Sequence, residues 1–197
     1  MLKNVTHAKC VRCGAEYEAV PGLTTCTCGG MLDIQYDYGY IRTLVSRETL
    51  SGCRDYSMWR YRPFLPVEAD SAPTPLRVGW SPLYPAPRLA RALGLKALYI
   101  KDDGQNPTSS LKDRASAMAV VKAREAGADT IACSSTGNAA SSLAGNAAAA
   151  GLHTYIFVPA RAPKGKVAQL MIFGATVITV DGSYEDTFEL SKAACLL

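Results

Sequence analysis

Residues 97–138 read ALYIKDDGQNPTSSLKDRASAMAVVKAREAGADTIACSSTGN and contain the same local pattern twice. In each copy, a short apolar run leads through polar turn residues into a stretch of good helix formers. Two strands and two helices are therefore expected, at Ala97–Lys101, Leu111–Ala126, Thr130–Cys133 and Asn138–Ala150. Gly127 and Gly151 follow the two helices, where glycine typically ends a helix.

The alternation of expected strands and helices continues after Gly151. The expected elements are strands at Thr154–Val158 and Thr176–Val180, a helix at Lys164–Phe173, and a last helix that begins at Ser183. Asp186 follows Ser183 by three residues, which is a close variant of the capping box. Strands that alternate with helices predict βαβ units, and hence an α/β fold with a parallel sheet of about four strands and helices on both faces.

The chain upstream of this pattern has a different composition. Residues 1–40 contain four clustered cysteines, and residues 62–87 hold seven prolines, which exclude a long helix there. We therefore predict three regions. They are a zinc-ribbon-like module at residues 1–40, an extended proline-rich lead-in at 41–96, and an α/β domain at 97–197.

Composition excludes several classes of function. The chain has 197 residues, of which 48% are hydrophobic, and a net charge of +4 that is spread without a basic run. This argues against nucleic acid as a partner. The apolar stretches are shorter than the ~20 residues of a membrane span, and the N-terminus has no apolar signal core. We expect a cytoplasmic protein with neither a membrane nor a nucleic-acid partner.

Cysteine spacing points to a metal. Two close pairs, Cys10 with Cys13 and Cys26 with Cys28, are separated by twelve residues. Tetrahedral zinc needs four such ligands, and four protein ligands make a site structural. Because the second pair is one residue tighter than usual, His7 is an alternative ligand. A redox-labile pair, or a ribbon without metal, is the other interpretation. The remaining Cys53, Cys133 and Cys195 are expected to be lone core thiols.

Each strand-to-helix turn carries residues that suit a ligand site. Lys112 lies in the first turn of its helix, near the sheet edge where α/β proteins bind ligands. A lysine there is either an ordinary solvated side chain or an amine nucleophile. The turn Ser135–Asn138 combines hydroxyls and amides at a helix N-terminus, which suits a carboxylate or a phosphate. Helix capping by Ser135 or Thr136 is the simpler explanation.

Together these segments resemble those of pyridoxal-phosphate enzymes with the tryptophan-synthase β-subunit fold, and of the threonine synthase family in particular. The resemblance covers most of the chain. It rests on the cysteine segment leading into residues 29–37 and on Met58–Tyr61, Gly79–Leu83, Asn106–Arg114 and Ser135–Asn138. It implies the three-layer αβα architecture of fold type II pyridoxal-phosphate enzymes.

The resemblance also implies roles for the site residues. Lys112 would bind pyridoxal phosphate covalently and act in catalysis, and Asn138 would contact the cofactor's 3′-oxygen. The substrate α-carboxylate would be bound by Ser135, Thr136, Gly137 and Asn138. The family reaction converts O-phospho-L-homoserine and water to L-threonine and phosphate, and the complete enzyme is expected to be a homodimer. Another β- or γ-replacement enzyme, such as cysteate synthase, is the alternative, and a non-catalytic zinc-bearing fragment is a further one.

Two departures from the family pattern stand out. Ser109 and Leu111 lie beside the lysine, where the family commonly has glycine and phenylalanine. The family's glycine-rich phosphate loop and its partner for the pyridine nitrogen come later in the chain, whereas only scattered glycines follow Gly151 here. We therefore expect this chain to be truncated and inactive by itself.

Overall fold

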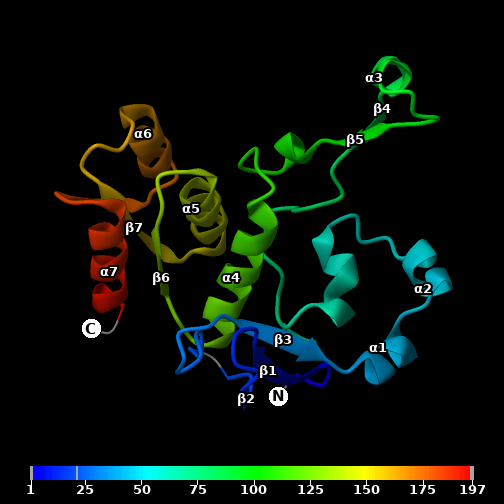
Figure 1. The fold of residues 1–197 in the computed structure, drawn as a ribbon, viewed down its shortest axis with the longest axis horizontal. Coiled ribbons are helices and arrows are strands. Elements are labelled where there is room, and N and C mark those ends of the chain that lie inside the picture. Colours follow the sequence, from blue (N-terminus) through cyan, green and yellow to red (C-terminus); the bar gives the residue numbers. More distant parts are fainter. Residues whose placement is uncertain (1, 21, 196–197) are drawn as a thin grey trace. The chain divides into compact units, whose positions relative to one another are not determined.

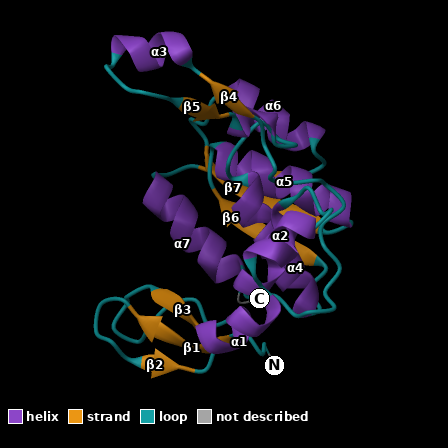
Figure 2. Ribbon diagram, turned by 90° about the vertical axis from the view of Figure 1, so that its right-hand side faces the viewer, coloured by secondary structure: helices purple, strands orange, loops and turns teal. Residues whose placement is uncertain are grey.

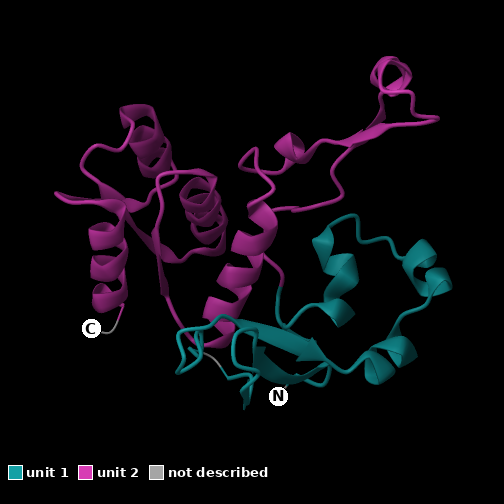
Figure 3. Ribbon diagram, viewed as in Figure 1, with its two compact units in different colours: residues 1–72 teal, residues 73–197 magenta. Residues whose placement is uncertain are grey.

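The computed structural model describes residues 2–20 and 22–195. They form two compact units, Met1–Ala72 and Pro73–Leu197, which are coloured separately in Figure 3. Each unit has its own sheet, so we describe each by itself.

The first unit is built on a three-stranded antiparallel sheet in the order β2-β1-β3. Its elements are β1 (Val5–Cys10), β2 (Glu16–Tyr17), β3 (Leu32–Tyr36), α1 (Tyr38–Leu44), α2 (Arg47–Gly52) and the 3₁₀ helix η1 (Met58–Phe64). Asp37 and Ser46 cap α1 and α2 through their side chains. Asn4 donates to the carbonyls of Pro63 and Leu65, which fastens the start of the chain to the end of η1.

The second unit contains two separate sheets. Its elements are β4 (Leu83–Pro85), α3 (Pro87–Ala92), β5 (Tyr99–Lys101), the 3₁₀ helix η2 (Asp103–Gln105), α4 (Asp113–Glu125), β6 (Thr130–Ser134), α5 (Asn138–Ala150), β7 (His153–Pro159), α6 (Lys164–Ile172), β8 (Thr176–Val180) and α7 (Tyr184–Ala194). The parallel sheet has the order β6-β7-β8. The predicted helices and strands from residue 111 onward are confirmed, including the capping box of Ser183 and Asp186.

The expectation of a four-stranded parallel sheet is wrong for the first strand. β5 pairs in antiparallel register with β4, so the parallel sheet has three strands in the described part of the chain. The physical reason is local, because the chain returns after α3 and the Ala86 N–H donates to the Leu98 carbonyl at 2.9 Å, which sets β5 beside β4. Periodicity identifies a strand but not its partner.

Helices cover both faces of the parallel sheet, as Figures 1 and 2 show. Ile156 and Val158 of β7 pack into the apolar core with α5, α6 and Val120 of α4. Tyr155 and Phe157 alternate with them and face a cavity of about 470 Å³, which Ala194 and Cys195 at the end of α7 also line. Successive side chains of a strand point to opposite faces, so α7 covers the face opposite α5 and α6.

Helix α5 is the centre of this core. Residues 140–147 are all buried, which explains its alanine-rich sequence, because small side chains let neighbouring elements approach closely. Ser141, Ser142 and Asn146 are the polar members of this buried run. Among the described residues, no helix is long and apolar enough to cross a membrane.

Candidate active site and cysteine cluster

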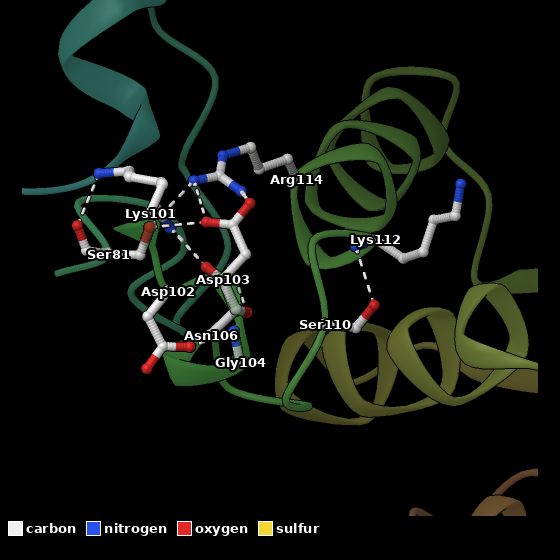
Figure 4. A network of polar contacts seen from close by, with 10 residues as sticks. Ser81, Lys101, Asp102, Asp103, Gly104, Asn106, Ser110, Lys112 and Arg114 are labelled. Carbon is white, nitrogen blue, oxygen red and sulfur yellow. Dashed lines mark hydrogen bonds and ion pairs between the residues drawn. The ribbon is translucent and has the colours of Figure 1, made fainter. Parts of the chain in front are cut away.

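Lys112 lies immediately before α4, at the end of the loop that follows η2. Its backbone N–H donates to the Ser110 hydroxyl at 3.1 Å, and its side chain is exposed. Figure 4 shows the side chain extending away from the neighbouring polar network. Nζ has no hydrogen bond or ion pair with the described residues, so the amine is available to react with a carbonyl compound.

The turn Ser135–Asn138 joins β6 to α5. The Gly137 N–H donates to the Ser135 hydroxyl at 3.2 Å, and Gly137 is the N-cap residue of the helix. Among the described residues, no side chain caps this N-terminus; the same holds for α3, α4 and α6, whereas side chains cap α1, α2 and α7. The first amides of a 13-residue helix are thus left for another acceptor, and a carboxylate suits this position.

The packing of α4 on α5 brings the two turns into one region. Asp113, the first residue of α4, accepts hydrogen bonds from Ser142 at 2.8 Å and from Asn146 at 2.9 Å. Ser142 is four residues beyond Asn138, a distance of roughly 6 Å along the helix axis. The start of α4, with Lys112 beside it, therefore lies about one turn along α5 from the Ser135–Asn138 turn.

A polar network secures the loop that leads to Lys112 (Figure 4). Arg114 donates to both carboxylate oxygens of Asp103, at 2.6 and 2.9 Å, and Ser81 donates to Asp103 at 2.6 Å. The Gly79 N–H donates to the Asn106 side chain at 3.0 Å. This network ties residues 79–81 to the start of α4, so two of the sequence segments with the family pattern lie against each other.

The four predicted metal ligands form a second site, in the first unit. The Sγ atoms of Cys10, Cys13, Cys26 and Cys28 all lie within 4.8 Å of one another. Cys10 and Cys28 are 3.6 Å apart, and Cys13 and Cys26 are 3.5 Å apart. His7 instead faces Glu16, with 3.6 Å between Nε2 and the carboxylate, so the tight second pair needs no replacement ligand.

The surroundings of the cluster favour thiolates on some of its members. The Tyr17 hydroxyl, 3.0 Å from Cys26 Sγ, lowers the pKa of Cys26 to about 6. The backbone amide of Cys13 likewise lowers the pKa of Cys10. The Gly30 amide stabilises the Cys28 thiolate, but the neighbouring sulfurs outweigh it and raise the pKa of Cys28 to about 12. Four sulfurs at this spacing thus resist full ionisation without a cation among them.

Glycine is required next to this cluster. A Cβ at Gly30 would lie 2.6 Å from Cys10 Sγ and 2.8 Å from Arg12 Cβ. The pair Gly29-Gly30 therefore allows the second cysteine knuckle to fold closely over the first. Of the other cysteines, Cys53 and Cys133 are partly buried, whereas Cys195 is exposed, which corrects its assignment to the core.

Sequence reasoning missed the residues that hold the Lys112 loop in place. Asp113 is fully buried, and its partners Thr108, Ser142 and Asn146 lie on the loop and on α5. The sequence did contain a signal for these contacts, because Ser142 and Asn146 are four residues apart within an alanine-rich helix. Polar residues at that spacing share one helix face and, when buried, require partners.

Comparison with known proteins extends these observations. The family model described as "Pyridoxal-phosphate dependent enzyme" matches residues 74–197. The threonine synthase of Methanocaldococcus jannaschii is 40% identical over 185 residues, which cover 93% of this chain and 45% of that protein. The threonine synthase of Methanosarcina acetivorans is 42% identical over 192 residues, covering 96% of this chain and 46% of that protein. The chain thus spans less than half the length of these relatives.

Solved structures share the fold. Diaminopropionate ammonia lyase of Escherichia coli, in its apo form, superimposes with a TM-score of 0.52 at 21% identity, covering 77% of this chain and 43% of that one. A pyridoxal 5′-phosphate-dependent aspartate racemase gives a TM-score of 0.54 at 26% identity, covering 59% of this chain and 37% of that one. The first of these likenesses concerns the fold alone.

Proposed function

Since this chain belongs to the family of pyridoxal-phosphate dependent enzymes, we propose that it forms part of a threonine synthase. The reaction would convert O-phospho-L-homoserine and water to L-threonine and phosphate. The observation that carries the proposal is the packing of α4 on α5. It brings together a lysine amine and a helix N-terminus that have no side-chain partner among the described residues. The similarity to threonine synthases extends over both units of the chain, which supports this substrate over others.

The residues present fit pyridoxal phosphate in their chemistry. Lys112 Nζ is a primary amine without a carboxylate partner among the described residues, as covalent attachment to an aldehyde requires. The Asn138 side chain, exposed at the start of α5, would donate to the cofactor's 3′-oxygen. When bound, the cofactor supplies an electron sink for carbanion chemistry.

The chain's own residues would bind the substrate and move protons. The hydroxyls of Ser135 and Thr136 and the amides of Gly137 and Asn138 would hold the α-carboxylate at the positive end of α5. Lys112 Nζ would, as a free amine, transfer protons along the substrate carbon chain. Phosphate leaves from Cγ and water adds at Cβ, so atoms balance with threonine and phosphate as products.

A substrate assay tests this proposal in the protein at its full natural length. We expect release of phosphate and threonine from O-phospho-L-homoserine, and loss of both in Lys112→Ala. Lys166→Ala, which removes an exposed lysine of α6, is the matched control and should retain activity. Consumption of phosphoserine in the presence of sulfite, without turnover of phosphohomoserine, would assign the protein to cysteate synthase chemistry instead.

For the cysteine cluster we propose structural zinc. A Zn–S bond of about 2.3 Å gives sulfur–sulfur distances of about 3.8 Å in a tetrahedron. The Cys13–Cys26 and Cys10–Cys28 sulfur pairs, at 3.5 and 3.6 Å, are near this value, and all four sulfurs lie within 4.8 Å of one another. Four cysteine ligands leave no open position for a reacting water, so the metal would stabilise the first unit rather than act in catalysis.

Metal analysis tests the zinc proposal. We expect about one zinc per chain, and its loss when Cys10 and Cys13 are both changed to Ser. Cys53→Ser removes a cysteine outside the cluster and should leave the zinc content unchanged. Full zinc content in the double variant would exclude the cluster as the site.

A further inference from the structure

Asp113 is a buried carboxylate that receives four hydrogen bonds. The Thr108 N–H donates to Oδ2 at 2.8 Å, and Oδ1 accepts from the Thr108 hydroxyl at 2.7 Å, from Ser142 at 2.8 Å and from Asn146 at 2.9 Å. Three of these bonds end on Oδ1 and one on Oδ2, so both oxygens accept from donors of the protein. It also begins α4, where the helix dipole favours a negative charge.

These four hydrogen bonds hold the loop of residues 108–113 in two ways. The bonds to Thr108 close residues 108–113 on themselves, and the bonds to Ser142 and Asn146 attach the closed loop to α5. Lys112 lies inside this loop, next to the anchored residue, and its own side chain is exposed. The carboxylate is directed inward and the amine outward, so Asp113 fixes the backbone of Lys112 without pairing with its charge.

Two features of α5 show that its surface is complementary to the loop of residues 108–113. A Cβ at Gly145 would lie 2.6 Å from the Thr108 methyl group, so the loop approaches where α5 has no side chain. The Asn146 side-chain amide donates to Asp113 at 2.9 Å and to the Ser142 carbonyl at 3.0 Å, while its buried Oδ1 lacks a partner among the described residues. Turning this amide over would place the oxygen against the carboxylate, so the unpaired oxygen is the lesser cost.

We propose that Asp113 is a positioning residue that holds Lys112 in register with the Ser135–Asn138 turn at the start of α5. The inference rests on the proposed function, because the register matters only when Lys112 bears the cofactor. Asp113 is not itself a catalytic residue, since it is buried and both of its oxygens accept from neutral donors of the protein.

The test compares Asp113→Asn with Thr187→Val in the protein at its full natural length. In Asp113→Asn, an amide N–H₂ group replaces one carboxylate oxygen. This donor then faces at least one of the four donors that Asp113 accepts from, so at least one hydrogen bond is lost. Thr187 is a buried hydroxyl of α7 that donates to the Ser183 carbonyl at 2.8 Å, so its loss destabilises a helix outside the site. Ser142→Ala removes a single donor and should give an intermediate effect.

Hydrogen exchange provides the first readout and needs no cofactor. We expect residues 108–112 to exchange roughly tenfold faster in Asp113→Asn, as for the loss of one hydrogen bond to a charged group, and not in Thr187→Val. Unchanged exchange in this segment would overturn the proposal regardless of what the protein binds.

Borohydride trapping of pyridoxal phosphate on Lys112, mapped by peptide mass, provides the second readout. We expect the trapping rate in Asp113→Asn to fall by roughly a hundredfold, the typical cost of a displaced reacting group. Thr187→Val should trap at the wild-type rate. Faster exchange with wild-type trapping would overturn the positioning role. Faster exchange with no trapping even in the wild type would instead refute the proposed function, while the anchoring of the loop by Asp113 would stand.

Discussion

Ser109 adopts a left-handed backbone conformation, with φ of 58°. This conformation costs a residue with a Cβ roughly 1–2 kcal/mol, whereas glycine adopts it freely. The resemblance to the threonine synthase family implies glycine at this position, and this turn geometry suits glycine. The strain lies three residues before Lys112, and such conformations often occur beside functional residues.

Replacing Ser109 with glycine should therefore stabilise the protein by about 1 kcal/mol, because it removes this strain. The Ser109 hydroxyl has no hydrogen bond to the described residues, so no contact is lost. Urea unfolding measures the gain. Ser109→Ala keeps the Cβ and is the matched control, and an equal gain in that variant would contradict the explanation.

The Asp103 carboxyl makes the free energy of unfolding depend on pH. Hydrogen bonds from Arg114, and then from Ser81, hold the pKa of this carboxyl below its usual value. A depressed pKa in the folded state means that the stabilisation is present above the unfolded pKa of about 4 and is lost as pH falls through the folded pKa.

We expect Asp103→Asn to lower the free energy of unfolding by about 1 kcal/mol at pH 7, since both partners are partly exposed. The difference from wild type should shrink as the pH is lowered below 4, because the wild-type carboxyl then becomes protonated as well. Denaturant titrations at several pH values measure this. Asp181→Asn changes an exposed carboxyl and controls for net charge. A difference that stays constant down to acid pH would rule out the Asp103–Arg114 pair as its origin.

At the scale of elements, two helical glycines have opposite roles. Gly145 of α5 meets the Thr108 methyl group, whereas a Cβ at Gly165 of α6 would meet nothing within 4 Å. Gly165→Ala should stabilise the protein by about 1 kcal/mol through helix propensity alone. Gly145→Ala should destabilise it by about 1–3 kcal/mol, because the Asn106–Lys112 loop must move outward.

Thermal unfolding of the two variants, measured side by side, gives the sign of each effect. In Gly145→Ala we also expect weaker binding of pyridoxal phosphate at Lys112. A stabilised Gly145→Ala variant would show that the loop does not rest on α5.

The sequence predicted the elements from residue 111 onward because helix propensity, glycine stops and a capping box all act locally. The placement of β5 was not predictable in this way, since periodicity does not identify a strand's partner and β4 lies on the other side of α3 in the sequence. The cysteine cluster was predictable from spacing alone. The contacts of Asp113 with α5 were not, because they join positions 29 and 33 residues apart.

At the scale of the whole molecule, the similarity to threonine synthases covers less than half of their length. The cofactor's phosphate is a dianion that needs a cradle of amides, and the glycines after Gly151 are isolated at positions 165, 174 and 182. The 197-residue chain by itself should therefore bind pyridoxal phosphate weakly, without saturation, and should not form threonine.

Absorbance titration of the purified 197-residue chain, followed by an assay with phosphohomoserine, measures both expectations. The protein at its full natural length is the comparison. Stoichiometric binding at micromolar cofactor, together with turnover by the 197-residue chain, would mean that the whole site lies within these residues.

The cysteine cluster and the strands around it are formed by residues that lie close together in the sequence, and this affects the order of folding. Its four ligands fall within residues 10–28, and the strands around them pair within residues 5–36. Short loops cost little entropy to close, so this part of the chain folds with low contact order. The parallel sheet and the Asp113 contacts must wait for segments synthesised much later. If the cluster binds the proposed zinc, we therefore expect metal binding to be an early event at the ribosome, completed before α5 is available to the loop that carries Lys112.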